Sequence, residues 1–390
     1  MRALASALVF AAIPAGAVPE RAPVPPSVST AALRIGYALG APTSILLRAK
    51  VFGDFKRAGV PVELYAKSLR GQAYEPISEY SADGGDKYGA KATGGELIAG
   101  LLAGRWELAT VGDGSFLEAL AQGQPIVAVA ELGHDVKGAS SHGFALRRGV
   151  VISKPGDYMG KLLASRRAGP SDAVLLLEYL EQAGLDLARD SIEIPKLPAT
   201  AAERAALPKD KLTLVHGVYE DDLRSGVESG IIDGGFVHIG GFERGRDRLT
   251  IVKPLDAWAD PSISNVLLVC RRDFLRDAVR RRQLKLLLKA YMGRIRYEKS
   301  LPSETRRYAG KEKRWLRMDG GVQGLSMPQY DDLPRVDLNA LHGMLTLLRK
   351  HRRIDGKPFE LEGSVDDGLL REAALEPAPS GSPGSGEASH

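Results

Sequence analysis

Side chains able to hold a small charged solute stand at the expected starts of three helices. They are hydroxyls, one carboxylate and one guanidinium, each near a glycine or a proline: Thr43, Ser44, Asp113, Ser115, Arg166 and Ser171. A helix start offers free backbone N–H groups and partial positive charge, which together bind anions. A guanidinium adds charge-assisted hydrogen bonds to a sulfonate or carboxylate. The pattern predicts a site for a small organic anion, and the Asp113 carboxylate could contact an amine of a ligand.

Each of these residues also has a purely structural interpretation. Asp113 could cap the helix expected over residues 116–121, and Thr43 could cap the helix that follows it. The serines beside them share this alternative. The guanidinium groups of Arg166 and Arg167 could be solvated, as those of most arginines are. The sequence alone leaves both interpretations open.

The elements that must position these residues alternate between strand and helix. Residues 33–37 are typical of a strand, residues 45–57 of a helix, and residues 60–65 of a second strand. A strand–helix–strand unit predicts a parallel α/β sheet. A junction of the form Gly-x-x-acid, at Gly104 and again at Gly230, ends a helix and leads into an apolar run in each half of the chain. The repeated junction favours two similar α/β domains facing each other.

The same alternation extends to residue 351. Helices are expected over residues 94–102, 116–121, 171–183, 221–229, 272–300 and 338–351. Strands are expected over residues 108–111, 125–130, 144–146, 150–152, 162–165, 236–239, 249–252 and 264–270. The long segment 68–93 has no periodicity, and a loop of that length is usually either functional or disordered.

The composition is that of a soluble globular protein. The 390 residues suffice for two domains, and 44% of them are hydrophobic and 26% charged. The net charge of +5 is concentrated in residues 271–282 and 306–317, which favours solvated helix faces over a nucleic-acid surface. Cys270 is the only cysteine, so internal disulfides are excluded, and its apolar run predicts a buried thiol.

No pattern of metal ligands or of a nucleotide-binding loop is present in the sequence. His134, His142 and His216 lack the spacing with a carboxylate that metal sites show. The glycines at the start of the helix 94–102 follow no strand and precede no Walker lysine. We therefore expect no metal and no cofactor.

The two ends of the chain have the composition of processing and linker segments. Residues 1–17 combine one arginine, an apolar run and an Ala-x-Ala pattern, which predicts a secretory signal peptide. Residues 18–32 are a proline-rich linker, and residues 374–390 are a Pro/Gly/Ser-rich tail expected to be disordered. No later run reaches the roughly 18 apolar residues of a membrane span. These features predict an exported protein.

With these elements in order, the chain resembles the periplasmic solute-binding proteins of nitrate, sulfonate and taurine ABC importers. The resemblance covers residues 33–352 and depends on five phrases in the same order, at residues 33–37, 101–109, 123–130, 154–161 and 229–233. It implies an α/β, two-lobe type II fold with a discontinuous first lobe. That lobe would combine residues 33–149 with 252–373, and residues 150–251 would form the second lobe. The ligand would lie between the lobes.

The resemblance also implies the site and the partners. The loops that contact the ligand would be residues 39–44, 112–115, 166–171 and 237–240. The last loop contains His238, which on the residues alone would be interpreted as a buried core histidine. The expected ligand-binding residues are Leu39, Gly40, Thr43, Ser44, Asp113, Ser115, Arg166, Ser171 and His238. The protein would be a monomer without catalytic activity that delivers its ligand to an ABC transporter permease and binds no nucleic acid.

The sequence departs from the family in segment 68–93 and at His238, which replaces a bulky aromatic or acidic residue. The long segment places several polar side chains near the expected site: Arg70, Gln72, Tyr74, Tyr80 and Lys91. The alternative is an enzyme on the same scaffold, because a sulfinate desulfinase shares the fold and has a long loop ending in a phrase like Gly94-Gly95-Glu96. Such an enzyme needs a cysteine after the first strand, where this chain has Ala38-Leu39-Gly40, and no Ser–His–carboxylate grouping is evident. Binding is therefore the favoured function.

Overall fold

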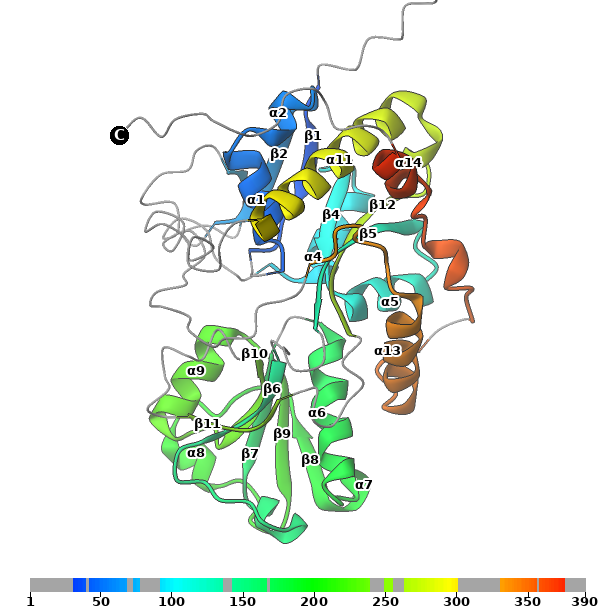
Figure 1. The fold of residues 1–390 in the computed structure, drawn as a ribbon. Helices are drawn as coiled ribbons and strands as arrows, with labels where there is room; N and C mark the ends of the chain where they lie inside the picture. The colour runs from blue at the N-terminus through cyan, green and yellow to red at the C-terminus, as the bar shows by residue number, and fades with distance from the viewer. Residues whose placement is uncertain are drawn as a thin grey trace, which may run out of the picture.

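The computed structural model describes residues 31–39, 42–68, 73–77, 92–135, 142–166, 169–238, 249–254, 263–300, 330–355 and 358–375. Within them the chain forms two lobes, each built on a mixed sheet (Figure 1). The expected signal peptide, most of segment 68–93 and the tail lie outside the described residues. None of the described helices combines the length and the apolar character that a membrane span requires.

The upper lobe contains the first sheet, in the order β3-β2-β1-β4-β12-β5. Its strands are β1 (Leu33–Gly36), β2 (Val62–Lys67), β3 (Tyr74–Pro76), β4 (Leu108–Val111), β5 (Ile126–Asp135) and β12 (Ile263–Arg271). β1 is parallel to both β2 and β4, as the strand–helix–strand pattern predicts. β12 lies antiparallel between β4 and β5, so the sheet includes a strand from late in the chain.

The lower lobe contains the second sheet, in the order β11-β6-β10-β7-β9-β8. Its strands are β6 (His142–Arg147), β7 (Leu162–Arg166), β8 (Ser191–Ile194), β9 (Leu212–Val218), β10 (Gly234–His238) and β11 (Leu249–Pro254). β7 is parallel to β9 and β10, and β8 is parallel to β9, whereas β6 runs antiparallel to β10 and β11. The carboxyl ends of the parallel strands meet at one edge of this sheet.

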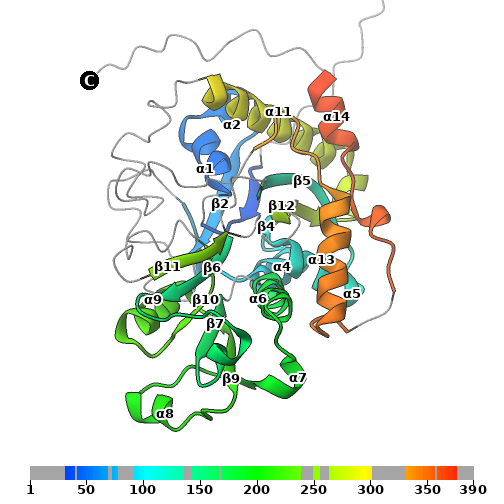
Figure 2. The same ribbon diagram turned by 60° about the horizontal axis from the view of Figure 1, so that its bottom comes forward.

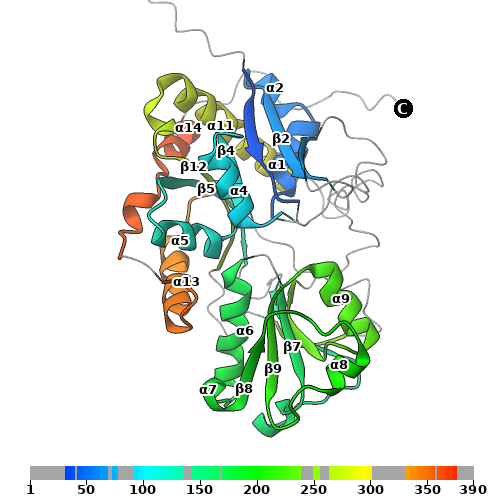
Figure 3. The same cartoon turned by 180° about the vertical axis from the view of Figure 1, so that it is seen from behind.

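Helices cover both sheets. Those of the upper lobe are α1 (Ser44–Val51), α2 (Asp54–Arg57), α4 (Gly94–Leu102), α5 (Asp113–Ala121), α11 (Ala278–Ser300), α13 (Leu338–Lys350) and α14 (Gly368–Leu375), with short 3-10 turns at Phe274–Arg276 and Glu362–Ser364. Those of the lower lobe are α6 (Pro170–Gln182), α7 (Leu187–Asp190), α8 (Ala201–Ala205) and α9 (Glu220–Ser229), with a 3-10 turn at Pro155–Tyr158. Seen from behind, α6 rises from the lower lobe toward α5 and α13 (Figure 3).

The chain crosses between the lobes from β5 to β6 and returns from β11 to β12, which makes the first lobe discontinuous. The crossings therefore lie between Asp135 and His142 and between Pro254 and Ile263. The sequence placed the boundaries later at the first crossing and earlier at the second, at residues 149–150 and 251–252. The difference arises because β6 and β11 both pair with β10, so they belong to the second sheet.

One buried apolar cluster is shared by the two lobes. It includes Phe116 of α5, Leu176 of α6 and Leu341 of α13, all of which are fully buried. Figure 2 shows α13 lying alongside both α5 and α6. Because burial of apolar surface is the main favourable term in folding, this shared cluster stabilises the present arrangement of the lobes.

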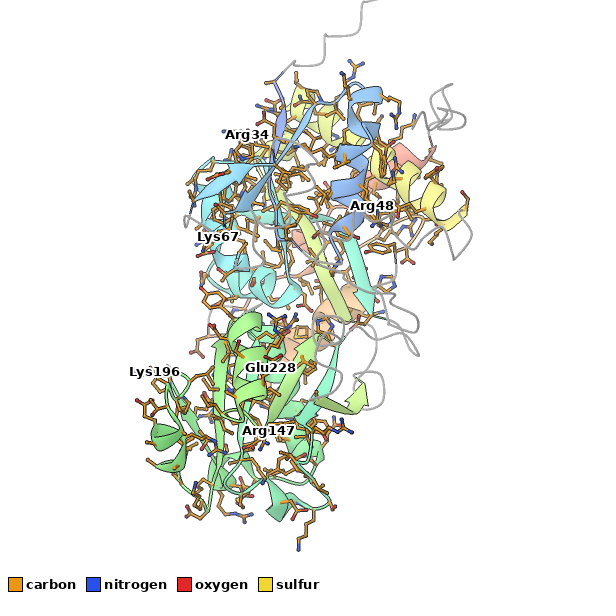
Figure 4. All side chains as sticks on the ribbon, turned by 90° about the vertical axis from the view of Figure 1, so that its left-hand side faces the viewer. Arg34, Arg48, Lys67, Arg147, Lys196 and Glu228 are labelled. Atoms are coloured by element: carbon orange, nitrogen blue, oxygen red, sulfur yellow. The ribbon has the colours of Figure 1, made fainter. Side chains whose placement is uncertain are left out.

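The repeated Gly-x-x-acid junction has a structural role in both lobes. Gly104 and Gly230 have φ values of +70° and +81°, the left-handed conformation that favours glycine. The acid of the first copy, Glu107, accepts a 2.6 Å hydrogen bond from Arg34. The acid of the second copy, Asp233, lies 3.1 Å from Arg147 in an ion pair. Figure 4 labels Arg34 in the upper lobe and Arg147 in the lower lobe, so each acid binds within its own lobe.

Two elements differ from those expected from the sequence. The single helix expected over residues 45–57 is divided into α1 and α2, because Gly53 adopts a left-handed φ of +75° between them. Residues 150–152, expected as a strand, have no regular secondary structure. An apolar run of three residues is too short to distinguish a strand from a packed loop.

Candidate ligand site between the lobes

The first turns of α5 and α6 meet where the two lobes touch. The Ser171 hydroxyl of α6 donates a 2.6 Å hydrogen bond to Asp113 Oδ1 of α5. The backbone N–H of Gly114 donates to the same Oδ1 at 2.6 Å and to Ser171 Oγ at 3.0 Å. Two predicted site residues that are 58 positions apart in the chain are thus in direct contact.

Glycines allow this close approach. A Cβ atom on Gly114 would lie 2.2 Å from Ser171 Oγ, and one on Gly94 would lie 2.3 Å from Ser115 Oγ. A Cβ on Gly169, which precedes α6, would lie 2.9 Å from the same Ser115 hydroxyl. The N-termini of α4, α5 and α6 therefore converge, and each contributes partial positive charge.

Asp113 is the charged group at this convergence. It is 4% exposed, and its Oδ2 atom has no hydrogen-bond partner among the described residues. Burial raises the pKa of its carboxyl to about 7, although the hydrogen bonds from Ser171 and Gly114 lower it. Coulombic repulsion from Asp172 adds to the increase. Asp113 is the first residue of α5, and Gly112 is its N-cap residue. The sequence left open that Asp113 is the N-cap residue, and the structure excludes this role.

Arg166 is held inside the lower lobe by neighbouring side chains. Its Nε donates to Asp172 Oδ2 at 2.7 Å, and its Nη2 lies 3.1 Å from His142 Nε2. Because a guanidinium only donates, Nε2 of this histidine accepts, and its Nδ1 donates to Asp135 at 2.8 Å. Two of the donors expected to grip an anion are therefore engaged with protein acceptors. Arg167 lies outside the described residues.

The first predicted ligand loop is shaped by buried hydroxyls. Thr43 Oγ1 donates to the carbonyl of Ala38 at 2.7 Å, and the backbone N–H of Ala38 donates to Thr110 Oγ1 at 2.8 Å. Thr43 makes no side-chain capping bond, and its hydroxyl instead holds Thr43 beside Ala38, which follows β1. Ser44 is fully buried and lies 3.2 Å from the hydroxyl of Tyr330.

Other predicted site residues are only partly placed. Leu39 packs at the edge of the upper-lobe core, and Gly40 lies outside the described residues. The backbone of His238 ends β10 opposite His142. Within segment 68–93, the hydroxyl of Tyr74 donates to Glu96 at 3.1 Å. The other polar residues named in that segment lie outside the described part of the chain: Arg70, Gln72, Tyr80 and Lys91.

Glu96 connects the end of this segment to the start of α4. Thr93 caps α4 through a reciprocal pair of hydrogen bonds with Glu96. The same carboxylate lies 2.7 Å from Lys67 at the end of β2. The glycines before Glu96 therefore begin a capped helix, as the sequence predicted.

A Ser–His–carboxylate grouping that was not evident from the sequence exists in the lower lobe. Ser165 Oγ lies 2.8 Å from His216 Nδ1, and His216 Nε2 lies 3.6 Å from Glu193 Oε1. The three residues come from β7, β9 and β8, so only the parallel register brings them together. Ser165 is fully buried, and no substrate atom can reach its hydroxyl in this structure. Glu193 also pairs with Arg353, which makes the grouping part of an ion network.

A second ion network joins α13 to α6. Lys350 lies 2.5 Å from Glu178 and 2.8 Å from Glu181, and His351 lies 3.2 Å from Glu178. The two carboxylates and the histidine are close enough to share a metal ion. The Lys350 ammonium already forms ion pairs with both carboxylates. It therefore supplies the positive charge that a metal ion would otherwise supply. We interpret the cluster as a contact between lobes.

Comparison with solved structures identifies the fold. The sequence matches no protein-family model and no curated protein. A ligand-binding component of an ABC-type import system from Staphylococcus aureus, with zinc bound, has a TM-score of 0.58 at 13% identity over 88% of this chain and 98% of that one. The periplasmic aliphatic sulphonate-binding protein SsuA from Escherichia coli has a TM-score of 0.54 at 16% identity over 88% and 100%. A desulfurization enzyme, DszB, has a TM-score of 0.52 at 12% identity over 88% and 98%. The chain therefore has the two-lobe α/β fold of type II periplasmic binding proteins, as expected from the sequence.

Proposed function

We propose that the protein is the extracytoplasmic solute-binding component of an ABC importer and holds a small solute between its lobes. The observation that carries this proposal is the contact of Gly114 and Asp113 with Ser171. It places the N-termini of two helices from opposite lobes at one point, with a third helix N-terminus beside them. In open α/β sheets, ligands bind at such helix starts beyond the carboxyl ends of strands.

The arrangement of the lobes also supports binding by closure. The chain crosses between them at two places, from β5 to β6 and from β11 to β12. Hinge closure around a ligand needs few connections and a contact surface that can separate. Two of the three solved structures compared above are binding proteins by their descriptions, and this agrees with the proposal.

The ligand would contact the loops predicted from the sequence: Leu39, Gly40, Thr43, Ser44, Asp113, Ser115, Arg166, Ser171 and His238. Of these, Asp113, Ser115 and Ser171 are the residues at the meeting of the lobes. The proposed ligand is a small organic anion of the sulfonate, taurine or nitrate type, or a related solute. The buried Asp113 carboxylate restricts which of them can bind.

The remaining parts of the proposal concern location and partners. Residues 1–17 would direct export and be removed, so that the mature protein is periplasmic. The closed form would be recognised by a membrane permease of the importer, and the binding protein would act as a monomer.

An enzyme on the same fold is the second candidate, because the desulfurization enzyme has a similar fold. Two observations favour binding over this candidate. Cys270 is fully buried in β12, and burial raises the pKa of its thiol, which opposes thiolate formation. The Ser165 hydroxyl is equally inaccessible.

Thermal unfolding of the purified protein with single solutes tests the proposal. Sulfonates, carboxylates, amino acids, nitrate and pyrimidines form the panel, with sulfite release from an aryl sulfinate measured in parallel. A solute that binds the native state raises the midpoint temperature, because it stabilises that state by RT ln(1 + L/Kd), where L is the solute concentration. Stabilisation by one solute class without turnover supports the proposal, whereas sulfite release supports the enzyme.

A further inference from the structure

The carboxylate of Asp113 has one satisfied oxygen and one unsatisfied oxygen. Oδ1 accepts hydrogen bonds from Ser171 and from the backbone of Gly114. Oδ2 has no partner within the described part of the chain, although the residue is buried and only 4% exposed. A buried acceptor without a donor is costly, so few persist in folded proteins without a function. The unsatisfied oxygen therefore marks a position where a ligand can supply a donor.

The surroundings of Asp113 disfavour a simple anion as that ligand. The N-termini of α4, α5 and α6 converge here and would attract negative charge. Asp113, the first residue of α5, already supplies that negative charge from within the protein. A second anion would lie against a buried carboxylate, and like charges in a site of low dielectric repel each other strongly.

No lysine or arginine in the described part of the chain forms an ion pair with Asp113. Among the described residues that act on it, Asp172 of α6 disfavours the ionised carboxylate and His142 of β6 favours it. The guanidinium of Arg166 on β7 is paired with Asp172 at 2.7 Å. From α4, Gly94 packs against Ser115, two residues after Asp113, and carries no ionisable side chain.

We propose that Asp113 is the specificity-determining residue of the site and binds a protonated amine, so that the solute is an amine or a zwitterion and not a simple anion. This inference depends on the proposed function and narrows its ligand class. An ammonium would donate to Oδ2 and neutralise the buried charge, while the partial positive charge of the neighbouring helix starts would favour the acidic end of a zwitterion.

The proposal has a pH dependence with a definite sign. The pKa of Asp113 is about 7 in the free protein, and a bound ammonium stabilises the ionised carboxylate. Binding below pH 7 must therefore release the carboxyl proton. The affinity for an amine should rise about tenfold per pH unit up to pH 7 and become constant above it.

Calorimetric titration with matched pairs of probes tests the proposal. The pairs are taurine with ethanesulfonate, β-alanine with propionate, and benzylamine with benzyl alcohol, each measured at pH 6 and pH 8. In each of the first two pairs only the amino group differs, and the third pair replaces the amine with a neutral donor. We expect at least one amine to bind at least tenfold more tightly than its partner at pH 8, with the preference reduced at pH 6.

Two variants assign the preference to Asp113. Asp113→Asn keeps the size of the side chain and the Oδ1 acceptor but replaces Oδ2 with a donor, so it should abolish the preference for the amine and permit ethanesulfonate or propionate to bind. Asp157→Asn is the control, because Asp157 also accepts backbone hydrogen bonds at a helix start but is far more exposed and lies in the lower lobe, outside the first turns of α5 and α6. It should leave the preference unchanged.

The outcomes separate this proposal from the proposed function. Equal or tighter binding of ethanesulfonate or propionate to the unmodified protein contradicts the role of Asp113 but supports solute binding. An amine preference that persists in Asp113→Asn also contradicts it. Binding of none of the six probes overturns the amine inference, and the proposed function is then decided independently by whether the protein purified from its host retains a solute.

Discussion

The Ser171 hydroxyl and the Asp113 carboxylate are joined by a 2.6 Å hydrogen bond that links the first turns of two helices from different lobes. Any movement that separates the lobes at this point must break that bond. The contact is therefore both a candidate ligand site and a sensor of lobe closure, and it gives the following predictions.

Replacing Gly114 with alanine should hold the lobes apart. The new Cβ would lie 2.2 Å from Ser171 Oγ and 2.9 Å from its backbone nitrogen, distances that force the two helices to separate. We expect a larger radius of gyration by small-angle X-ray scattering and loss of solute binding. Gly95→Ala is the matched control, because a Cβ there meets nothing within 4 Å at a similar position in a first helical turn. Equal scattering curves for the two variants would contradict the assignment of Gly114 to the contact between the lobes.

Asp113 should make the folded protein less stable as the pH rises from about 4 to 7. Its pKa is about 7 in the folded protein and 3.8 as the ordinary value, so the native state binds the proton more tightly than the unfolded state. The contribution of Asp113 to the free energy of unfolding is then greatest below about pH 4. It falls between the unfolded and the folded pKa and is constant above about pH 7. The total loss of stability is roughly 4 kcal/mol.

Urea unfolding of the parent and of Asp113→Asn at pH 5 and pH 8 measures this effect. The difference in the free energy of unfolding between the two proteins should depend on pH, with Asp113→Asn gaining relative stability at pH 8. A difference that is the same at both pH values would show that the carboxyl of Asp113 titrates normally.

Ser171→Ala should destabilise the protein and raise the pKa of Asp113 further. The hydroxyl stabilises the ionised carboxylate, and its removal also leaves the backbone N–H of Gly114 with one acceptor fewer. We expect a loss of about 1–2 kcal/mol in the free energy of unfolding. Carbon-13 NMR of labelled aspartate carboxyls follows the titration, and an unchanged midpoint for Asp113 would contradict the hydrogen bond.

Lys350→Ala should weaken the contact between α13 and α6 more than it weakens the fold. Lys350 is 45% exposed as a side chain and bonds to two carboxylates of α6, so its contribution to overall stability is at most about 1 kcal/mol. Both acids belong to the other lobe, and their release should favour an open form. Lys299→Ala removes an exposed ion pair within the upper lobe and is the control. Scattering in the absence of solute should show expansion only in Lys350→Ala.

The sequence predicted local structure well where glycine or capping residues mark the ends of elements. α4 and β4 have the expected limits, and the left-handed glycines at 104 and 230 end their helices as predicted. The break at Gly53 was not foreseen, because a glycine within a periodic helical pattern is often tolerated. Local signals thus define most elements but not every interruption.

The composition of the candidate site was only partly accessible from the sequence. Asp113 and Ser171 could be proposed separately from their positions at helix starts, but nothing in the sequence indicates that they touch. The grouping of Ser165, His216 and Glu193 depends on the register of three parallel strands, two of which were not predicted. Contacts between distant segments depend on tertiary packing, which cannot be predicted from local patterns in a single sequence.

Native mass spectrometry of the protein purified from its host without denaturation tests the central claim most directly. If the lobes enclose a solute beside Asp113 and Ser171, the parent should carry an additional small-molecule mass that is lost on gentle activation. Gly114→Ala, in which closure is blocked, should carry none, and Gly95→Ala should retain it. A parent without a bound mass, or equal retention by the parent and Gly114→Ala, would contradict a solute site between the lobes.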